Sequence, residues 1–174
     1  VQVIKAVDKE LVTGKLEMEP LVKDGSIQSD PSRDMLKIVV YNRYSAAAPA
    51  VGFISGFGLK KGAIASSVAH DSHNLVAVGT SDEEIVAAIN RLVELKGGLV
   101  AVDGASVIAE LPLPVAGLMT CGTVDAAAEG HNLVQKAASD LGCTLGSPYM
   151  TLAFMCLPVI PALKITDRGL VEMN

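Results

Sequence analysis

The sequence is poor in aromatic residues and has no tryptophan. Phe, Trp and Tyr together make up 3% of its 174 residues, whereas hydrophobic residues make up 50%. The apolar content is therefore mainly Ala, Val, Leu and Ile, which suits sheets and helices packed through small side chains. Such an apolar content excludes intrinsic disorder, and the length is sufficient for one domain with a buried core.

Clustered positive charge is also absent. The chain has 14 Lys and Arg against 19 Asp and Glu, a net charge of -5, and its one adjacent basic pair is Lys60-Lys61. Nucleic-acid binding needs gathered basic residues, with aromatic residues among them for stacking on single strands. The sequence therefore predicts no nucleic-acid partner.

Cysteines are few and far apart. Cys121, Cys143 and Cys156 form no Cys-x-x-Cys pair, and no neighbouring residue marks one of them as activated. This pattern predicts reduced, mostly buried thiols in a cytoplasmic protein.

Charged residues are missing between residues 141 and 163. This stretch contains Pro148, Pro158 and Pro161, and three prolines are too many for one membrane-spanning helix. We expect buried strand and loop there, and no membrane partner.

The first part of the chain alternates apolar and polar residues in short runs. Residues 1–23 read as the end of a small β segment, and residues 23–34, KDGSIQSDPSRD, as a polar, turn-rich linker. We therefore expect a boundary that separates residues 1–23 from a domain at 24–174. The sequence is also expected to be a piece of a longer polypeptide.

The remaining residues predict strands, hairpins and two helices. Strands are expected at 35–44, 150–158 and 162–173, and hairpins at 62–80 and 99–111, the second around Asp103-Gly104. A helix begins after Ser81, with Glu84 completing a capping box, and ends at Gly97-Gly98; a second spans 123–142. The order predicts an α+β fold, with mixed α/β possible: a largely antiparallel sheet with hairpins, and two main helices covering one face.

A polar cluster lies at the tip of the first predicted hairpin: His70, Asp71, Ser72, His73 and Asn74. A zinc-type site needs three or four ligands, so no metal site is predicted within this chain. Sequence neighbours rarely have triad geometry, which disfavours a nucleophilic serine. Two interpretations stay open: a histidine that hydrogen-bonds a substrate or moves a proton, and a plain polar turn.

Three long blocks resemble the C-terminal domain of bacterial adenine deaminases. They are residues 52–80 (GFISGFGLKKGAIASSVAHDSHNLVAVGT), 90–120 (NRLVELKGGLVAVDGASVIAELPLPVAGLMT) and 148–173 (PYMTLAFMCLPVIPALKITDRGLVEM). The resemblance covers roughly residues 20–174 and implies an enzyme of the amidohydrolase superfamily. Such enzymes serve purine salvage by converting adenine and water to hypoxanthine and ammonia, with a water activated by manganese or iron.

The resemblance also implies how the work is divided within the enzyme. The metal centre lies in a (β/α)₈ barrel that precedes this domain, so the chain alone is expected to be inactive, to hold no metal and to contain no catalytic residue. Its partners would be the barrel of the same polypeptide, adenine in the full-length enzyme, and further copies in a homo-oligomer.

Two roles for the domain follow from the resemblance. The tip formed by residues 70–74 could lie on the substrate side or act as a lid, so that the domain completes the active-site rim and subunit contacts. Alternatively, the domain is a purely structural or oligomerisation module. The sequence departs from the family at Asn42-Arg43-Tyr44, where relatives carry an acidic residue, Arg and His; Tyr44 would change any substrate contact made by that histidine.

Overall fold

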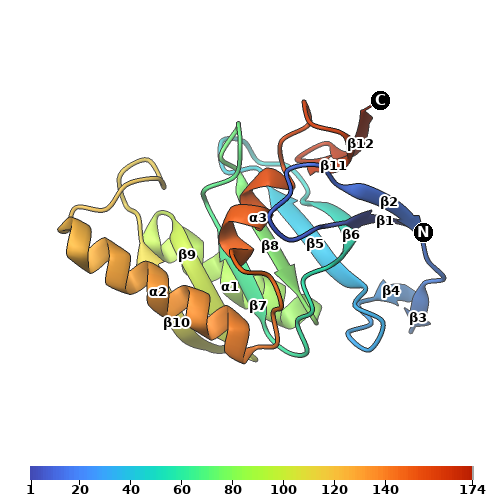
Figure 1. Ribbon diagram of the computed structural model, residues 1–174, viewed down its shortest axis with the longest axis horizontal. Coiled ribbons are helices and arrows are strands. Elements are labelled where there is room, and N and C mark those ends of the chain that lie inside the picture. The colour runs from blue at the N-terminus through green and yellow to red at the C-terminus, as the bar shows by residue number, and fades with distance from the viewer. Residues whose placement is uncertain (174) are drawn as a thin grey trace.

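A central sheet organises the chain, for which the computed structural model describes residues 1–173. Within these residues the sheet consists of β1 (Gln2–Lys5), β2 (Gly14–Glu17), β5 (Leu36–Tyr41), β6 (Ala50–Ser55), β7 (Ala63–Ser66), β8 (Leu75–Gly79), β9 (Gly98–Asp103) and β10 (Ser106–Pro112). The strand order is β10-β9-β7-β8-β5-β6-β1-β2 (Figure 1). Neighbouring strands are antiparallel except β1 and β6, which are parallel. The prediction of an α+β fold with a largely antiparallel sheet is confirmed.

Helices α1 (Asp82–Leu95) and α2 (Val124–Asp140) lie on opposite faces of this sheet (Figure 1). Ala63 and Ala65 of β7 pack in the cluster that contains α1, whereas Ile64 between them packs in the cluster that contains α2. The prediction that both helices cover one face is therefore wrong. The reason is that β7, β8 and β9 are apolar on both sides, so that each face needs its own cover.

Helix α1 begins and ends where the sequence predicts. The Ser81 hydroxyl accepts the Glu84 backbone N–H at 3.2 Å, as a capping residue does. Lys96 follows the helix with φ 61°, and its N–H and that of Gly97 bond to the last carbonyls. The two predicted hairpins form as β7–β8 and β9–β10.

Three segments differ from the sequence-based expectations. The hairpin of β3 (Leu21–Lys23) and β4 (Ser26–Gln28) lies where a linker was predicted. Helix α3 (Pro148–Phe154) replaces the strand predicted at 150–158; it starts with a proline, which suits a first helical turn, and it is too short for a clear helical periodicity. Strand β6 was not predicted.

Gly52 explains the composition of β6. A Cβ at this position would lie 3.1 Å from both Ile165 Cδ1 and Leu170 Cδ2. These side chains belong to the closing hairpin, β11 (Ala162–Thr166) and β12 (Gly169–Met173), which takes the place of the strand predicted at 162–173. The glycine therefore marks a close approach of another element to a strand, not a turn.

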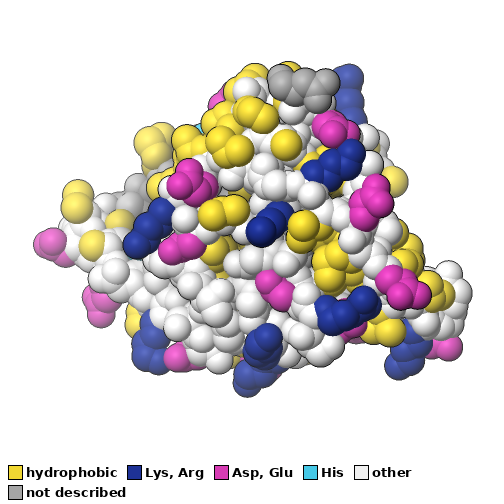
Figure 2. Space-filling view, turned by 45° about the vertical axis from the view of Figure 1, so that its right-hand side comes forward, with side chains coloured by type: hydrophobic (Ala, Val, Ile, Leu, Met, Phe, Trp, Pro, Cys, Tyr) yellow, Lys and Arg dark blue, Asp and Glu magenta, His cyan; other side chains and the backbone are white. Residues whose placement is uncertain are grey.

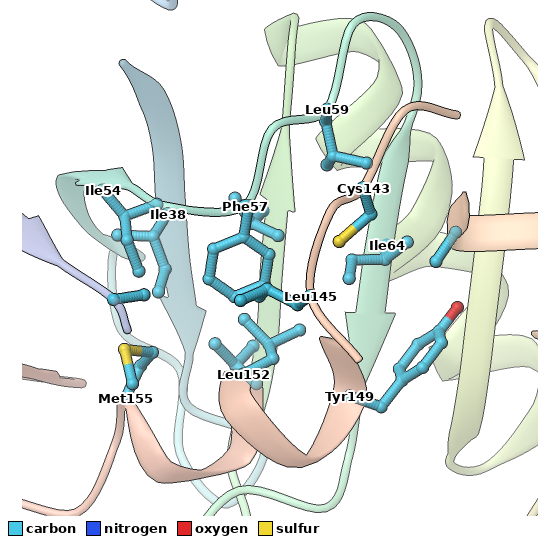
Figure 3. Packing of buried hydrophobic residues seen from close by; sticks show 14 of the residues in the cluster. Ile38, Ile54, Phe57, Leu59, Ile64, Cys143, Leu145, Tyr149, Leu152 and Met155 are labelled. Atoms are coloured by element: carbon cyan, nitrogen blue, oxygen red, sulfur yellow. The ribbon is translucent and has the colours of Figure 1, made fainter. Parts of the chain in front are cut away.

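The larger core lies between the sheet and the α2–α3 side. Phe57, Leu152 and Met155 point toward one another beside Ile38 and Ile54 (Figure 3) and are fully buried. Tyr149 lies at the border of this cluster and donates its hydroxyl to the Val100 carbonyl at 3.0 Å, so that α3 is anchored to β9.

Strand β1 pairs with β6, so the N-terminal segment belongs to the central sheet; the boundary near residues 23–24 stays a prediction. On the face shown in Figure 2, Lys and Arg are dispersed among Asp and Glu. Within residues 1–173, no helix has the length and apolar character needed to cross a membrane.

Candidate functional site

Several loops gather at one end of the sheet, along the upper edge in Figure 1. They are the loops at 42–49, 67–74 and 113–123, which connect strand and helix ends on that side. Hydrogen bonds tie them together: Tyr44 donates its hydroxyl to the Ser72 carbonyl at 2.8 Å, and Ser67 donates to the Gly117 carbonyl at 2.6 Å. The predicted tip at residues 70–74 is therefore part of a fixed loop cluster.

The two histidines of the tip lie side by side. Their ring centroids are 5.5 Å apart at an angle of 65°. The His70 ring also stacks on Phe154 of α3, and its backbone N–H donates to the Ala153 carbonyl at 3.2 Å. The loop thus brings together two imidazoles that an uninterrupted strand would direct to opposite faces.

His73 is held in one orientation by its own turn. Its φ of 51° is left-handed, its N–H donates to the Ala69 carbonyl at 2.7 Å, and its Nδ1 accepts the Ala69 N–H at 3.2 Å. Because Nδ1 accepts, the proton of the neutral ring lies on Nε2. Partial burial, then His70 and Arg43, lower the pKa of His73, so that the ring is neutral at neutral pH and offers one N–H donor.

The other three residues of the tip differ in exposure. Asn74 is buried; its Oδ1 accepts the Arg43 N–H at 3.3 Å and its Nδ2 donates to the Ser72 hydroxyl at 3.2 Å. Asp71 and Ser72 are exposed. The Ser72 hydroxyl thus bonds to an amide and not to an imidazole, which does not support its use as a nucleophile.

The structure adds Arg43 and Lys96, which sequence reasoning did not assign to the site, and places them beside Tyr44. Arg43, Tyr44 and Lys96 line a shallow hollow of about 500 Å³ together with His73, Ala116 and Leu118. The Arg43 guanidinium lies over the Tyr44 ring, 5.0 Å from its centroid. No local signal in the sequence marks Arg43 or Lys96, because the hollow is assembled from segments far apart along the chain.

Potential metal-ligand clusters and reactive thiols are scarce among the described residues. Within residues 1–173, His, Cys, Asp and Glu do not gather in threes as metal ligands would. In the same part of the chain the three cysteines are free thiols: Cys143 and Cys156 are buried, and Cys121 is exposed. Burial raises the pKa of Cys143 to about 11 and that of Cys156 to about 12, which keeps these two as unreactive thiols.

Comparison with known proteins identifies relatives along the entire chain. The family model of the adenine deaminase C-terminal domain matches residues 10–174. The chain is 51% identical over 174 residues to an adenine deaminase of Methanosarcina mazei, which covers 100% of this chain and 31% of the relative. An adenine deaminase of Brucella anthropi is 48% identical over 165 residues, 94% of this chain and 29% of the relative. The chain therefore spans just under a third of the length of these relatives.

Proposed function

The chain belongs to the adenine deaminase C-terminal domain family, and we propose that it works as that part of a longer enzyme, which hydrolyses adenine to hypoxanthine and ammonia. The observation that carries the proposal is the match of about half of its residues to adenine deaminases along its full length. The remainder of the polypeptide would supply the barrel. There manganese or iron would activate the attacking water when bound.

We propose that residues 70–74 lie on the substrate side of the enzyme. The support is the fixed neutral His73, whose Nε2–H has no hydrogen-bond acceptor among residues 1–173, next to His70 and beside the exposed Asp71 and Ser72. Purine ring nitrogens are acceptors for such a donor. A loop positioned by a rigid sheet is a common place for binding residues, and a lid of this kind would also exclude water.

Substitution in the full-length enzyme tests this role. His70→Ala and His73→Ala should each lower kcat/KM about tenfold or more, with unchanged metal content. His131→Ala is the matched control, since His131 is an exposed histidine on α2. Wild-type kinetics for both tip variants would contradict a substrate-side role.

A second candidate is a structural and oligomerisation module, which a separate apolar groove favours. The groove lies beside α1, has a volume of about 400 Å³ and is lined in part by Val39, Tyr41, Val51, Val86 and Ile89. Val51 and Val86 are about half exposed. Hydrophobic side chains also gather on the upper part of the face in Figure 2. Surfaces of this kind are typical of contacts with another domain or subunit.

Assembly and turnover separate the two candidates. Val86→Asp in the full-length enzyme should change the molar mass measured by light scattering, while turnover per assembled site stays the same. The isolated chain should self-associate and should release no ammonia from adenine with added manganese or ferrous iron. Turnover by the isolated chain would contradict the proposed division of work. A cytoplasmic location completes the proposal and can be checked by fractionation.

A further inference from the structure

Two cations near the tip have no carboxylate partner among residues 1–173. Arg43 and Lys96 both line the hollow of about 500 Å³ described above and a neighbouring one of about 310 Å³. Within residues 1–173 neither forms an ion pair, whereas six other Lys and Arg residues do. What distinguishes Arg43 and Lys96 from the other Lys and Arg residues without an ion pair is that the two line the same hollow.

Both residues are held in place through other contacts. Arg43 Nη2 donates to the Ala116 carbonyl at 2.6 Å and to the Tyr44 hydroxyl at 3.1 Å. The guanidinium packs so closely on Gly117 that a Cβ there would lie 2.2 Å from Nη1. Its Nε is shielded from solvent and has no acceptor among the described residues. Lys96 is exposed, and its backbone is fixed as the cap of α1.

We propose that this hollow binds a small oxyanion of the sulfate or phosphate class, held by Arg43 and Lys96. Arg43 contributes a fixed positive charge, since its Nη2 already donates to protein acceptors and its Nε is shielded from solvent. The exposed ammonium of Lys96 adds a second charge with donors for the oxyanion oxygens. Tyr44 and Leu118 provide part of the wall beside the two cations. This inference does not depend on the proposed enzymatic function, because every residue that carries it lies in this chain.

Each cation also has a purely structural explanation, and the test must distinguish this explanation from anion binding. A lysine at the C-terminal end of α1 interacts favourably with the helix dipole, and Arg43 connects two loops. Under this explanation, removing either charge would lower stability, and the chain would show no specific response to an anion.

The pKa of His73 can report whether an anion is bound in the hollow. It lines the same hollow, and a bound anion stabilises the charged form of a neighbouring imidazole. Sulfate should therefore raise the pKa of His73. His131, which is exposed on α2 and does not line the hollow, is the internal control.

The experiment is an NMR titration of the histidine rings in the 174-residue chain. Sodium sulfate is compared with sodium chloride at equal ionic strength, in wild type, Lys96→Gln and the charge-matched control Lys136→Gln, whose lysine is exposed on α2. Sulfate should raise the pKa of His73 and leave the ring resonances of His131 as they are in chloride. Lys96→Gln should weaken sulfate binding on the order of tenfold, and Lys136→Gln should bind as wild type does.

Two results would overturn the inference. One is a His73 pKa that is the same in sulfate and chloride; the other is equal sulfate affinity in Lys96→Gln and Lys136→Gln. Lys96 is exposed, so its variant should remain folded, which a dispersed amide spectrum would verify. AMP and adenosine then separate the sources of the oxyanion: AMP binding tighter than sulfate indicates a nucleotide phosphate, and equal affinity a free oxyanion.

Discussion

The imidazole of His70 stacks on the phenyl ring of Phe154, with 5.0 Å between the ring centroids and 27° between the planes. The adjacent hydrogen bond from the His70 N–H to the Ala153 carbonyl strengthens the same contact. Helix α3 therefore sets the position of the tip at residues 70–74, although α3 lies far away along the chain.

Phe154→Ala should loosen this tip. Loss of the stacked ring should lower the free energy of unfolding by about 2 kcal/mol and accelerate amide exchange at residues 70–74. Denaturant unfolding and hydrogen exchange measure the two effects. Met150→Ala removes an exposed side chain from the same helix and should leave exchange at the tip unchanged; equal exchange in both variants would contradict the role of Phe154.

Glu84 joins helix α1 to two neighbouring turns. Its carboxylate accepts the backbone N–H groups of Gly62 at 2.9 Å and Gly104 at 3.2 Å, and the Thr80 hydroxyl at 2.6 Å. Glu84→Ala should therefore lower the free energy of unfolding by about 2 kcal/mol. Glu83→Ala, an exposed carboxylate in the same helical turn, should change it by less than about 0.5 kcal/mol. Equal effects in chemical denaturation would refute this assignment.

Lys164 should make stability depend on alkaline pH. Its side chain is fully buried and donates to the carbonyls of Leu11 at 2.7 Å and Phe154 at 3.1 Å. Burial lowers the pKa of Lys164 from 10.5 to about 8. Below pH 8 both folded and unfolded chains hold the proton, and the buried charge destabilises the fold. Between about pH 8 and 10.5 the unfolded chain binds more protons, so this destabilisation disappears as the pH rises.

Comparison with Lys164→Met isolates the effect, because other titrating groups are common to both proteins. The free energy of unfolding of wild type relative to Lys164→Met should increase by roughly 3 kcal/mol between about pH 7 and pH 10.5. Urea unfolding at a series of pH values measures this difference. A difference that stays constant, or decreases, would show that the lysine is not buried as a charge.

Gly117→Ala should disturb the loop that holds Arg43. The residue has φ 75°, and a Cβ would collide with the Arg43 guanidinium. Gly104 has φ 58° with open space around it, so Gly104→Ala measures the backbone cost alone, about 1 kcal/mol. Gly117→Ala should cost about 1–3 kcal/mol more. Thermal unfolding gives both values, and equal costs would argue against tight packing of Arg43.

The three cysteines should differ in reactivity. Cys121 is exposed, whereas Cys143 and Cys156 are buried thiols whose pKa values burial raises. At pH 8 a thiol reagent should modify Cys121 rapidly and the other two only after denaturant is added. Mass spectrometry identifies the modified sites; rapid modification of Cys156 in the folded chain would contradict the described core.

Local signals predicted some elements correctly from the sequence. Ser81 and Glu84 mark the start of α1 because a capping box is a contact between residues three apart. Asp103-Gly104 marks the β9–β10 hairpin because a tight turn also depends only on residues that are close in sequence. Elements defined by distant contacts were harder to predict. Strand β6 was not predicted, and only the packing of Ile165 and Leu170 against Gly52 shows why this strand contains a glycine.

By itself, the sequence determined the α+β class, the main hairpins, both long helices and the resemblance to adenine deaminases. These features depend on neighbouring residues or on long continuous stretches of the sequence. The tertiary structure decided which face each helix covers, how His70 and His73 meet, and that Arg43 and Lys96 share a hollow with His73. The physical reason is that strand ends and loops from distant segments come together only when the sheet order is established. No spacing along the chain encodes that order.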